Sequence, residues 1–89
     1  VVDPKFYPNP FKDSITISYD LVLPTKVTII IYSWSGQEIK RSHTEKRTVG
    51  EYEFLWDGKD QQNNEVSPGA YVVEIHSKMV STSQVIIKQ

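Results

Sequence analysis

The sequence predicts an all-β protein, a small antiparallel β-sandwich of about six to seven strands. Apolar and polar residues alternate over several short segments, which is typical of strands with one buried face. These segments recur at intervals of about 8–12 residues and are separated by turn-forming residues, as in sandwiches. Apolar residues do not recur at helical spacing over a useful length. With 89 residues the chain is long enough for one domain.

The first two strands are expected on either side of Pro24. In segment 15–21 the apolar residues all fall on one side of a period-2 pattern. Segment 26–33 is the most apolar, with isoleucines on both faces, so we expect both faces to be partly covered. Segment 34–37 then predicts a turn, in which Gly36 can supply a positive φ.

The middle of the chain is more polar. Segment 38–44 alternates weakly and carries many charges, which favours an edge strand, because charged edges resist pairing with other chains. Segment 46–50 is expected to be a connection. Segment 51–57 alternates cleanly and predicts a strand with its aromatic residues facing inward.

A polar loop over 57–68 and two strands over 70–77 and 83–88 complete the expected fold. The loop contains the turn signals Asp57-Gly58 and Asn63-Asn64. The inward positions of all the strands predict the core, which comprises Ile17, Ile29, Ile31, Phe54, Trp56, Tyr71, Val73 and Ile86.

Residues 1–13 are expected to form an extended lead-in or linker to a sandwich over residues 14–89. Pro8 and Pro10 fix the backbone there without adding ladder hydrogen bonds. The chain begins with Val1 rather than methionine, so we expect it to be a piece of a longer protein with an upstream domain.

Composition excludes several classes of function. A formal net charge of −1 argues against a dedicated nucleic-acid binder, which needs an excess of basic residues. The longest apolar run, 29–32, is far too short to span a membrane. The chain has no cysteine, which excludes disulfides, cysteine-based zinc sites and thiol catalysis.

The order of the motifs resembles one known family. These motifs are YPNPF at 7–11, a strand–turn–strand at 27–39, GEY to WDGKD at 50–60, PGAY at 68–71 and VIIK at 85–88. Together they resemble the C-terminal sorting domain of type IX secretion cargo proteins, an Ig-like sandwich similar to that of flagellar hook-capping proteins. The resemblance therefore implies an Ig-like form of the predicted sandwich.

The resemblance also implies a function and a set of recognition residues. Such domains are read by the outer-membrane translocation machinery and are often removed by a sortase-like peptidase. The cargo passes through the periplasm and outer membrane and is secreted or kept at the cell surface. Carried over to this chain, the signal residues are Pro8, Asn9, Pro10, Tyr32, Gly36, Gly69, Tyr71 and Lys88. We expect Lys88 to lie at the surface.

Catalysis and metal binding find little support in the sequence. His43 and His76 belong to no recognisable motif, so we expect no enzyme activity and no cofactor. The loop residues Asp57, Asp60 and Asn63 are weak candidates for calcium ligands, but the EF-hand spacing is absent and Lys59 opposes a cation. Turn formation explains these loop residues better.

Other binding roles stay open from the residues alone. Trp34, Trp56 and the tyrosines allow a carbohydrate-binding module, although the alternation favours Trp56 as a core residue. A structural Ig-like spacer of an extracellular enzyme is the other alternative. The basic residues of 40–47 and the acidic stretch 51–65 allow a docking surface with opposed charges. We favour the simpler interpretation that these residues lie in solvated loops.

Overall fold

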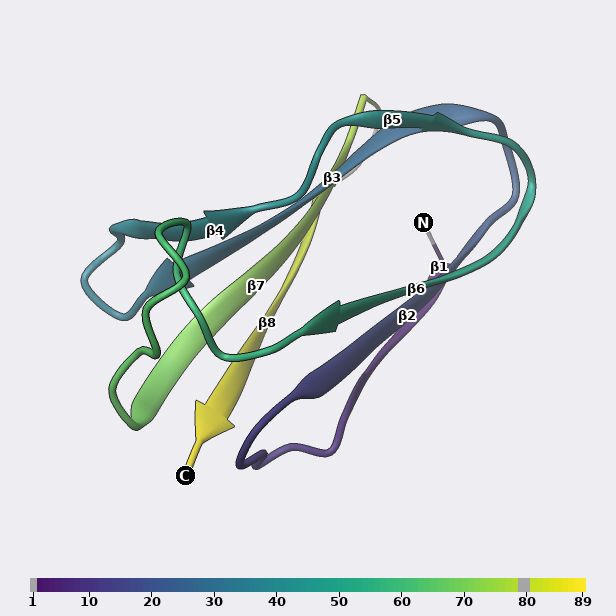
Figure 1. Ribbon diagram of the computed structural model, residues 1–89. Helices are drawn as coiled ribbons and strands as arrows, with labels where there is room; N and C mark the ends of the chain where they lie inside the picture. Colours follow the sequence, from purple (N-terminus) through teal and green to yellow (C-terminus); the bar gives the residue numbers. More distant parts are fainter. Residues whose placement is uncertain (1, 79–80) are drawn as a thin grey trace.

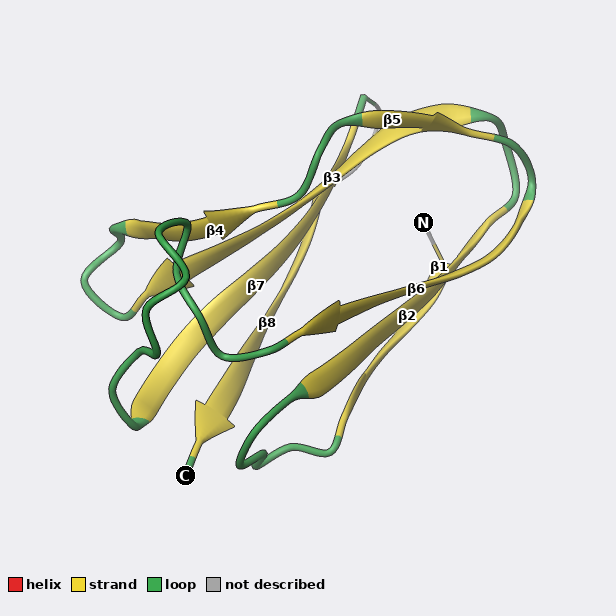
Figure 2. Ribbon diagram, viewed as in Figure 1, coloured by secondary structure: helices red, strands yellow, loops and turns green. Residues whose placement is uncertain are grey.

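Two antiparallel sheets packed face to face make up the computed structural model, which describes residues 2–78 and 81–89 (Figure 1). Strands and loops account for all of these residues (Figure 2). Within this part of the chain, no helix is long and apolar enough to cross a membrane. The eight strands of the described residues are β1 (Val2–Tyr7), β2 (Ile15–Leu21), β3 (Thr25–Ser33), β4 (Glu38–Arg41), β5 (Glu45–Arg47), β6 (Gly50–Trp56), β7 (Gly69–Ser77) and β8 (Ser81–Lys88).

The smaller sheet has the order β1-β2-β6, and the larger one has the order β4-β3-β7-β8. Strand β5 also belongs to the larger sheet, where it pairs with the first residues of β3 while β4 pairs with the last ones. Long β3 therefore carries two short strands in succession along one edge. The β2–β6 pair runs in unbroken register from Ile15 opposite Trp56 to Leu21 opposite Gly50.

The core lies between the two sheets and follows the period-2 pattern. In β2 every second residue is buried, beginning with Ile15. Strand β3 is buried on both faces over part of its length, since Ile30 on the outer face is as well covered as its inward neighbours. Seven of the eight residues predicted for the core lie in it, and the eighth, Phe54, is partly buried and packs against it. The all-β antiparallel sandwich predicted from the sequence is confirmed.

Two segments differ from the sequence-based expectation. Residues 2–7 are extended as expected, but they form β1, which pairs with β2 and so adds ladder hydrogen bonds to the smaller sheet. Pro4, the one proline within β1, is tolerated because β1 is an edge strand, where a missing donor can face solvent. Segment 46–50 was expected to be a connection, yet Glu45–Arg47 pair with β3. Its charges suit an exposed edge, and β3 is long enough to offer it a partner.

Candidate functional site

The residues carried over from the family resemblance gather at one end of the sandwich, which we call the motif end. There the loop between β1 and β2 lies beside the end of β8 (Figure 1). This loop contains Pro8, Asn9 and Pro10, and the Tyr7–Pro8 and Asn9–Pro10 peptide bonds are both cis. All three residues are exposed.

Asn9 binds the edge of β8 through both ends of its amide group. The backbone N–H of Ile87 donates to Asn9 Oδ1 at 3.0 Å, and Asn9 Nδ2 donates to the carbonyl oxygen of Val85 at 3.2 Å. Successive residues of a strand point their backbone groups to opposite edges. The side chain of Asn9 therefore satisfies groups that face away from β7.

Phe11 continues this coverage with its backbone. Its N–H donates to the carbonyl of Ile87 at 2.9 Å, and its own carbonyl accepts from the N–H of Gln89 at 2.8 Å. These bonds form a parallel bridge to Lys88. The Phe11 ring is 1% exposed and packs at 5.6 Å between centroids against Trp56. Phe11 was not among the site residues predicted from the sequence, although a large apolar residue directly after Pro10 indicated a buried position.

Gly69 and Tyr71 stand on the other side of β8. Gly69 is the register partner of Lys88, and Tyr71 is the partner of Ile86. The Tyr71 ring meets the edge of Trp56 at 5.5 Å, and its hydroxyl donates to the carbonyl of Ser67. Burial raises the pKa of the Tyr71 phenol above its ordinary value. Tyr71 is thus a core residue that holds the loop before β7.

Lys88 is not at the surface, and this part of the sequence-based expectation is wrong. The residue is 5% exposed, and its ammonium group lies 3.2 Å from Glu65 Oε1. Its aliphatic stem passes over Gly58, where an added Cβ would lie 3.1 Å from Lys88 Cε. The period-2 pattern contained the signal, because Lys88 shares the face of buried Ile86.

Tyr32 and Gly36 extend the motif end along the larger sheet. Ser33 is opposite Tyr71 in the register and Tyr32 is opposite Val72, so the turn after β3 lies close to the start of β7. Gly36 has φ 92° and donates to the carbonyl of Ser33 at 2.9 Å. Desolvation, followed by the carboxylate of Glu74, raises the pKa of Tyr32. Both predicted residues are therefore in the same region as the β8 contacts.

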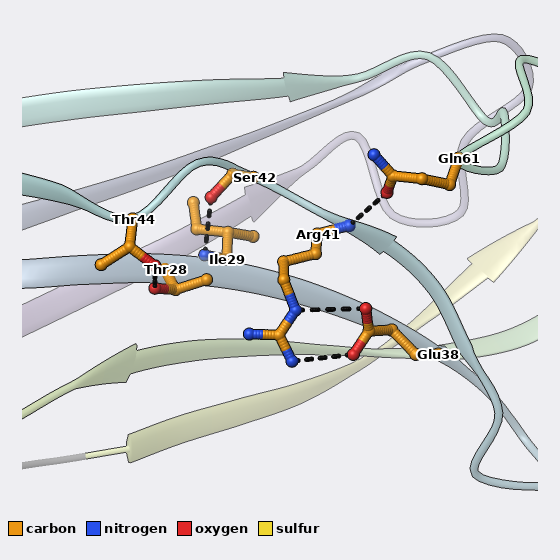
Figure 3. A network of polar contacts seen from close by, with 7 residues as sticks. All are labelled: Thr28, Ile29, Glu38, Arg41, Ser42, Thr44 and Gln61. Atoms are coloured by element: carbon orange, nitrogen blue, oxygen red, sulfur yellow. Dashed lines mark hydrogen bonds and ion pairs between the residues drawn. The ribbon is translucent and has the colours of Figure 1, made fainter.

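Polar contacts fix β4 and the loop that covers its edge (Figure 3). Arg41 donates to both carboxylate oxygens of Glu38, at 3.1 and 2.8 Å, and this pairing lowers the pKa of Glu38. Gln61 Oε1 accepts from the backbone N–H of Arg41 at 3.0 Å. Further along, Ser42 Oγ accepts from the N–H of Ile29 at 2.9 Å. Gln61 thus covers the edge of β4 near Arg41.

The three loop residues considered as calcium ligands instead stabilise the conformation of their own loop. Asp60 Oδ1 accepts the backbone N–H groups of Gln62 and Asn64 at 3.0 and 2.9 Å. Asp57 Oδ1 accepts from the N–H of Lys59 at 3.2 Å, and Asn63 supplies a φ of 68°. In residues 2–78 and 81–89, no group of three or more acidic or histidine side chains is placed to hold a metal ion.

The remaining candidates are dispersed. Trp56 is buried as predicted, whereas Trp34 is 69% exposed on the turn after β3. The basic segment 40–47 does not form one patch, since the Arg41 guanidinium binds Glu38 and that of Arg47 lies over the Tyr52 ring at 4.7 Å. His43 is exposed.

These features define the chain as an Ig-like β-sandwich. At one end, the loop that connects β1 and β2 of the smaller sheet binds the β8 edge of the larger sheet. The chain belongs to the FlgD Ig-like domain family, whose model matches residues 12–80. FlgD from P. aeruginosa is similar at 25% identity, with a TM-score of 0.66 over 84% of this chain and 58% of that one. FlgD from Xanthomonas campestris, whose structure is described as giving insights into the hook capping essential for flagellar assembly, is 19% identical, with a TM-score of 0.65 over 89% of this chain and 58% of that one.

Two proteins of Porphyromonas gingivalis share the fold over almost the whole chain. PorZ, described as an essential bacterial surface component of the type-IX secretion system, is 22% identical, with a TM-score of 0.69 over 97% of this chain and 11% of that one. Latent PorU is 19% identical, with the same TM-score over 97% and 9%. This chain therefore spans a little over half of FlgD and about a tenth of the other two. None of the curated protein sequences matches it.

Proposed function

We propose that this chain is a non-catalytic sorting domain, recognised by the type IX outer-membrane translocation machinery and attached to a larger secreted or cell-surface protein. The observation that carries the proposal is the gathering of residues from four separate motifs at the motif end. The fold shared with PorZ, a component of that secretion system, supports it. The proposed route runs through the periplasm and outer membrane, and a sortase-like peptidase is the proposed processing enzyme.

The motif residues divide into two groups by exposure. Pro8, Asn9, Pro10, Gly36 and Gly69 are exposed and form the surface that a receptor could contact. Tyr71 and Lys88 are buried, and Tyr32 is partly so. We propose that these three act by holding the exposed residues in place, since only accessible groups can contact a partner.

The proposed connection to a cargo domain lies at the start of the chain. Residues 2–7 are the edge strand of the smaller sheet, and the loop over 8–10 is bound to β8. An upstream domain would therefore join the sandwich through the first residues of β1.

A fusion experiment tests the proposal. Residues 1–89 are fused to a reporter that is exported to the periplasm of a host with a working type IX system, and reporter is measured at the surface and in the medium. We expect the fusion to leave the periplasm and Pro8→Ala to reduce its release several-fold. Pro24→Ala, at an exposed proline away from the motif end, is the matched control and should be released normally.

Melting curves of the purified variants separate loss of fold from loss of recognition. The proposal fails if the folded fusion stays in the periplasm while the host exports its own cargo. It also fails if Pro8→Ala and Pro24→Ala, both folded, are released equally well. In either case a structural Ig-like spacer becomes the better interpretation.

A further inference from the structure

Three lysines form one row across the outer face of the larger sheet, at the end away from the motif end. Lys26 and Lys46 are direct register partners on β3 and β5. Val27 is opposite Ser77, so Lys78 lies one position further along, beside Lys26. Adjacent strands are about 4.8 Å apart, which brings three ammonium-bearing side chains into a narrow strip. We call these residues the lysine row.

The lysine row lacks compensating charge. In the described part of the chain, none of its ammonium groups lies within ion-pair distance of a carboxylate. The lysines line an open groove of about 680 Å³ that has no acidic residue in its wall. Arg41 also borders the groove, but its guanidinium is bound to Glu38. Like charges placed directly opposite each other destabilise a sheet, and a bound anion would remove that cost.

The floor of the groove supplies neutral polar groups. Thr28 is 4% exposed, and its hydroxyl lies 2.6 Å from that of Thr44 (Figure 3). His76, the register partner of Thr28, forms a hydrogen bond of 2.7 Å through Nδ1 to Ser81 Oγ. Lysine ammonium groups act as point charges and suit tetrahedral anions such as phosphoryl groups, whereas planar carboxylates are best bound by arginine.

Exposed apolar loops adjoin the lysine row. Val22 and Leu23 are each 61% exposed, and Val49 is 59% exposed. The loops that carry them run side by side between the two sheets, because Leu21 pairs with Gly50 and Thr25 pairs with Arg47 (Figure 1, right). Pro24 belongs both to the first loop and to the groove wall. Apolar side chains are thus presented next to a row of cations.

We propose that this end of the sandwich binds an anionic lipid surface. The lysine row contacts headgroup phosphates, and Val22, Leu23 and Val49 enter the boundary between headgroups and acyl chains. Basic residues beside exposed apolar ones are the combination that holds a protein at such an interface. A soluble anion would use the lysines alone and leave the apolar loops unexplained. This inference is independent of the sorting role, because it concerns the opposite end of the molecule.

Vesicle co-sedimentation of the full chain tests the proposal. Vesicles of equimolar phosphatidylcholine and phosphatidylglycerol should bind the protein at low ionic strength, and vesicles of phosphatidylcholine alone should not. Each lysine near an anionic surface contributes about fivefold to partitioning. Lys26→Gln/Lys46→Gln should therefore weaken binding about 25-fold. Val22→Gln/Leu23→Gln should weaken it as well, although the charge is unchanged.

Lys5→Gln/Lys12→Gln is the matched control, because it removes two exposed lysines from other surfaces and gives the same net charge. This variant should bind like the original chain. Equal loss in both lysine variants would overturn the proposal in favour of a general charge effect. Absence of binding to the anionic vesicles would also overturn it. So would full binding by Val22→Gln/Leu23→Gln together with displacement by inorganic phosphate at matched ionic strength, which would indicate a soluble-anion site.

Discussion

Lys88 is the residue whose position most changes how the motif end is interpreted. A basic residue in a recognition signal suggests a charge that a receptor contacts. The side chain of Lys88 is instead buried, and its ammonium group pairs with the exposed carboxylate of Glu65. Its stem fills space above Gly58, whose φ of 74° and lack of a Cβ leave room for it. Lysine can bury its methylenes in this way while keeping its charge near water. The residue therefore contributes chiefly by packing.

Substitutions at Lys88 should separate packing from charge. Lys88→Ala removes the buried stem, and we expect it to lower the free energy of unfolding by about 2 kcal/mol. Lys88→Met keeps a stem of similar length and should cost less than about 1 kcal/mol, because Glu65 stays solvated without its partner. Urea denaturation of both variants measures the difference. Equal losses in the two would mean that the ion pair, not the packing, stabilises this site.

At the scale of elements, β8 depends on contacts along both of its edges. One edge pairs with β7 over its whole length, from Gly69 opposite Lys88 to His76 opposite Ser81. Along the other edge, the contacts found in residues 2–78 and 81–89 lie near residues 85–89, where Asn9 and Phe11 bind it. An uncovered edge invites pairing with other chains. The loop over 8–10 thus protects the part of β8 that lies at the motif end.

Removing the side chain of Asn9 should expose this edge locally. In Asn9→Ala the N–H of Ile87 loses its acceptor, and we expect its hydrogen exchange to accelerate at least tenfold. The N–H of Ile86, which faces β7, should change much less. Asn64→Ala is a control at an exposed asparagine outside this contact. Unchanged exchange at Ile87 in Asn9→Ala would show that the Phe11 bridge alone protects the edge.

The strands that the sequence predicted well are those with at least one buried face, and segment 26–33, which is buried on both faces, also matches β3 to within one residue. Segments 15–21, 51–57 and 70–77 match β2, β6 and β7 to within one residue at each end, because alternation reports burial directly. Strands β1 and β5 were missed because edge strands need little buried apolar surface: β1 contains a proline and two charged residues, and all three residues of β5 are charged. The contact of Asn9 with β8 joins residues 78 positions apart, and no local pattern encodes such a pairing.

The residues of the candidate site could be predicted from the sequence, but their arrangement in space could not. The motif residues were found through the resemblance, but their exposure depended on the fold. Lys88 and Gly69 are register partners across two strands, and Tyr71 packs against Trp56 in the core. The lysine row could not be predicted from the sequence, because Lys26, Lys46 and Lys78 come together only when β5, β3 and β7 pair.

At the scale of the whole molecule, buried phenols link stability to pH. Burial is the largest cause of the raised pKa of both Tyr19 and Tyr71. In the unfolded chain these groups lose their protons near pH 10, whereas in the folded chain they keep them to higher pH. The unfolded state then binds fewer protons, so stability falls as pH rises beyond the unfolded pKa.

Thermal melting at increasing alkaline pH should reveal this link. We expect the melting temperature to fall once the pH passes about 10, and to fall less steeply in Tyr71→Phe, which has no proton to lose there. At neutral pH the same variant should be less stable by about 1 kcal/mol, since the hydrogen bond to Ser67 is lost. Tyr7→Phe, at an exposed tyrosine, is the control for the loss of one phenol at the surface. Parallel curves for all three proteins would contradict the linkage.

The bridge between Phe11 and Lys88 also determines when the fold can be completed during synthesis, because β8 is the last of the strands to be made. Ribosomes make the chain from its N-terminal end, so Phe11 emerges long before β8 exists. Until then the Phe11 ring lacks the neighbouring strand, and the backbone N–H and carbonyl of Phe11 lack their partners on β8. The contacts of the loop over 8–10 with the larger sheet must therefore form late, around the newly made β8. A chain paused before residue 81 would leave Phe11 and the edge of β7 uncovered, in a state that chaperones and proteases can still reach.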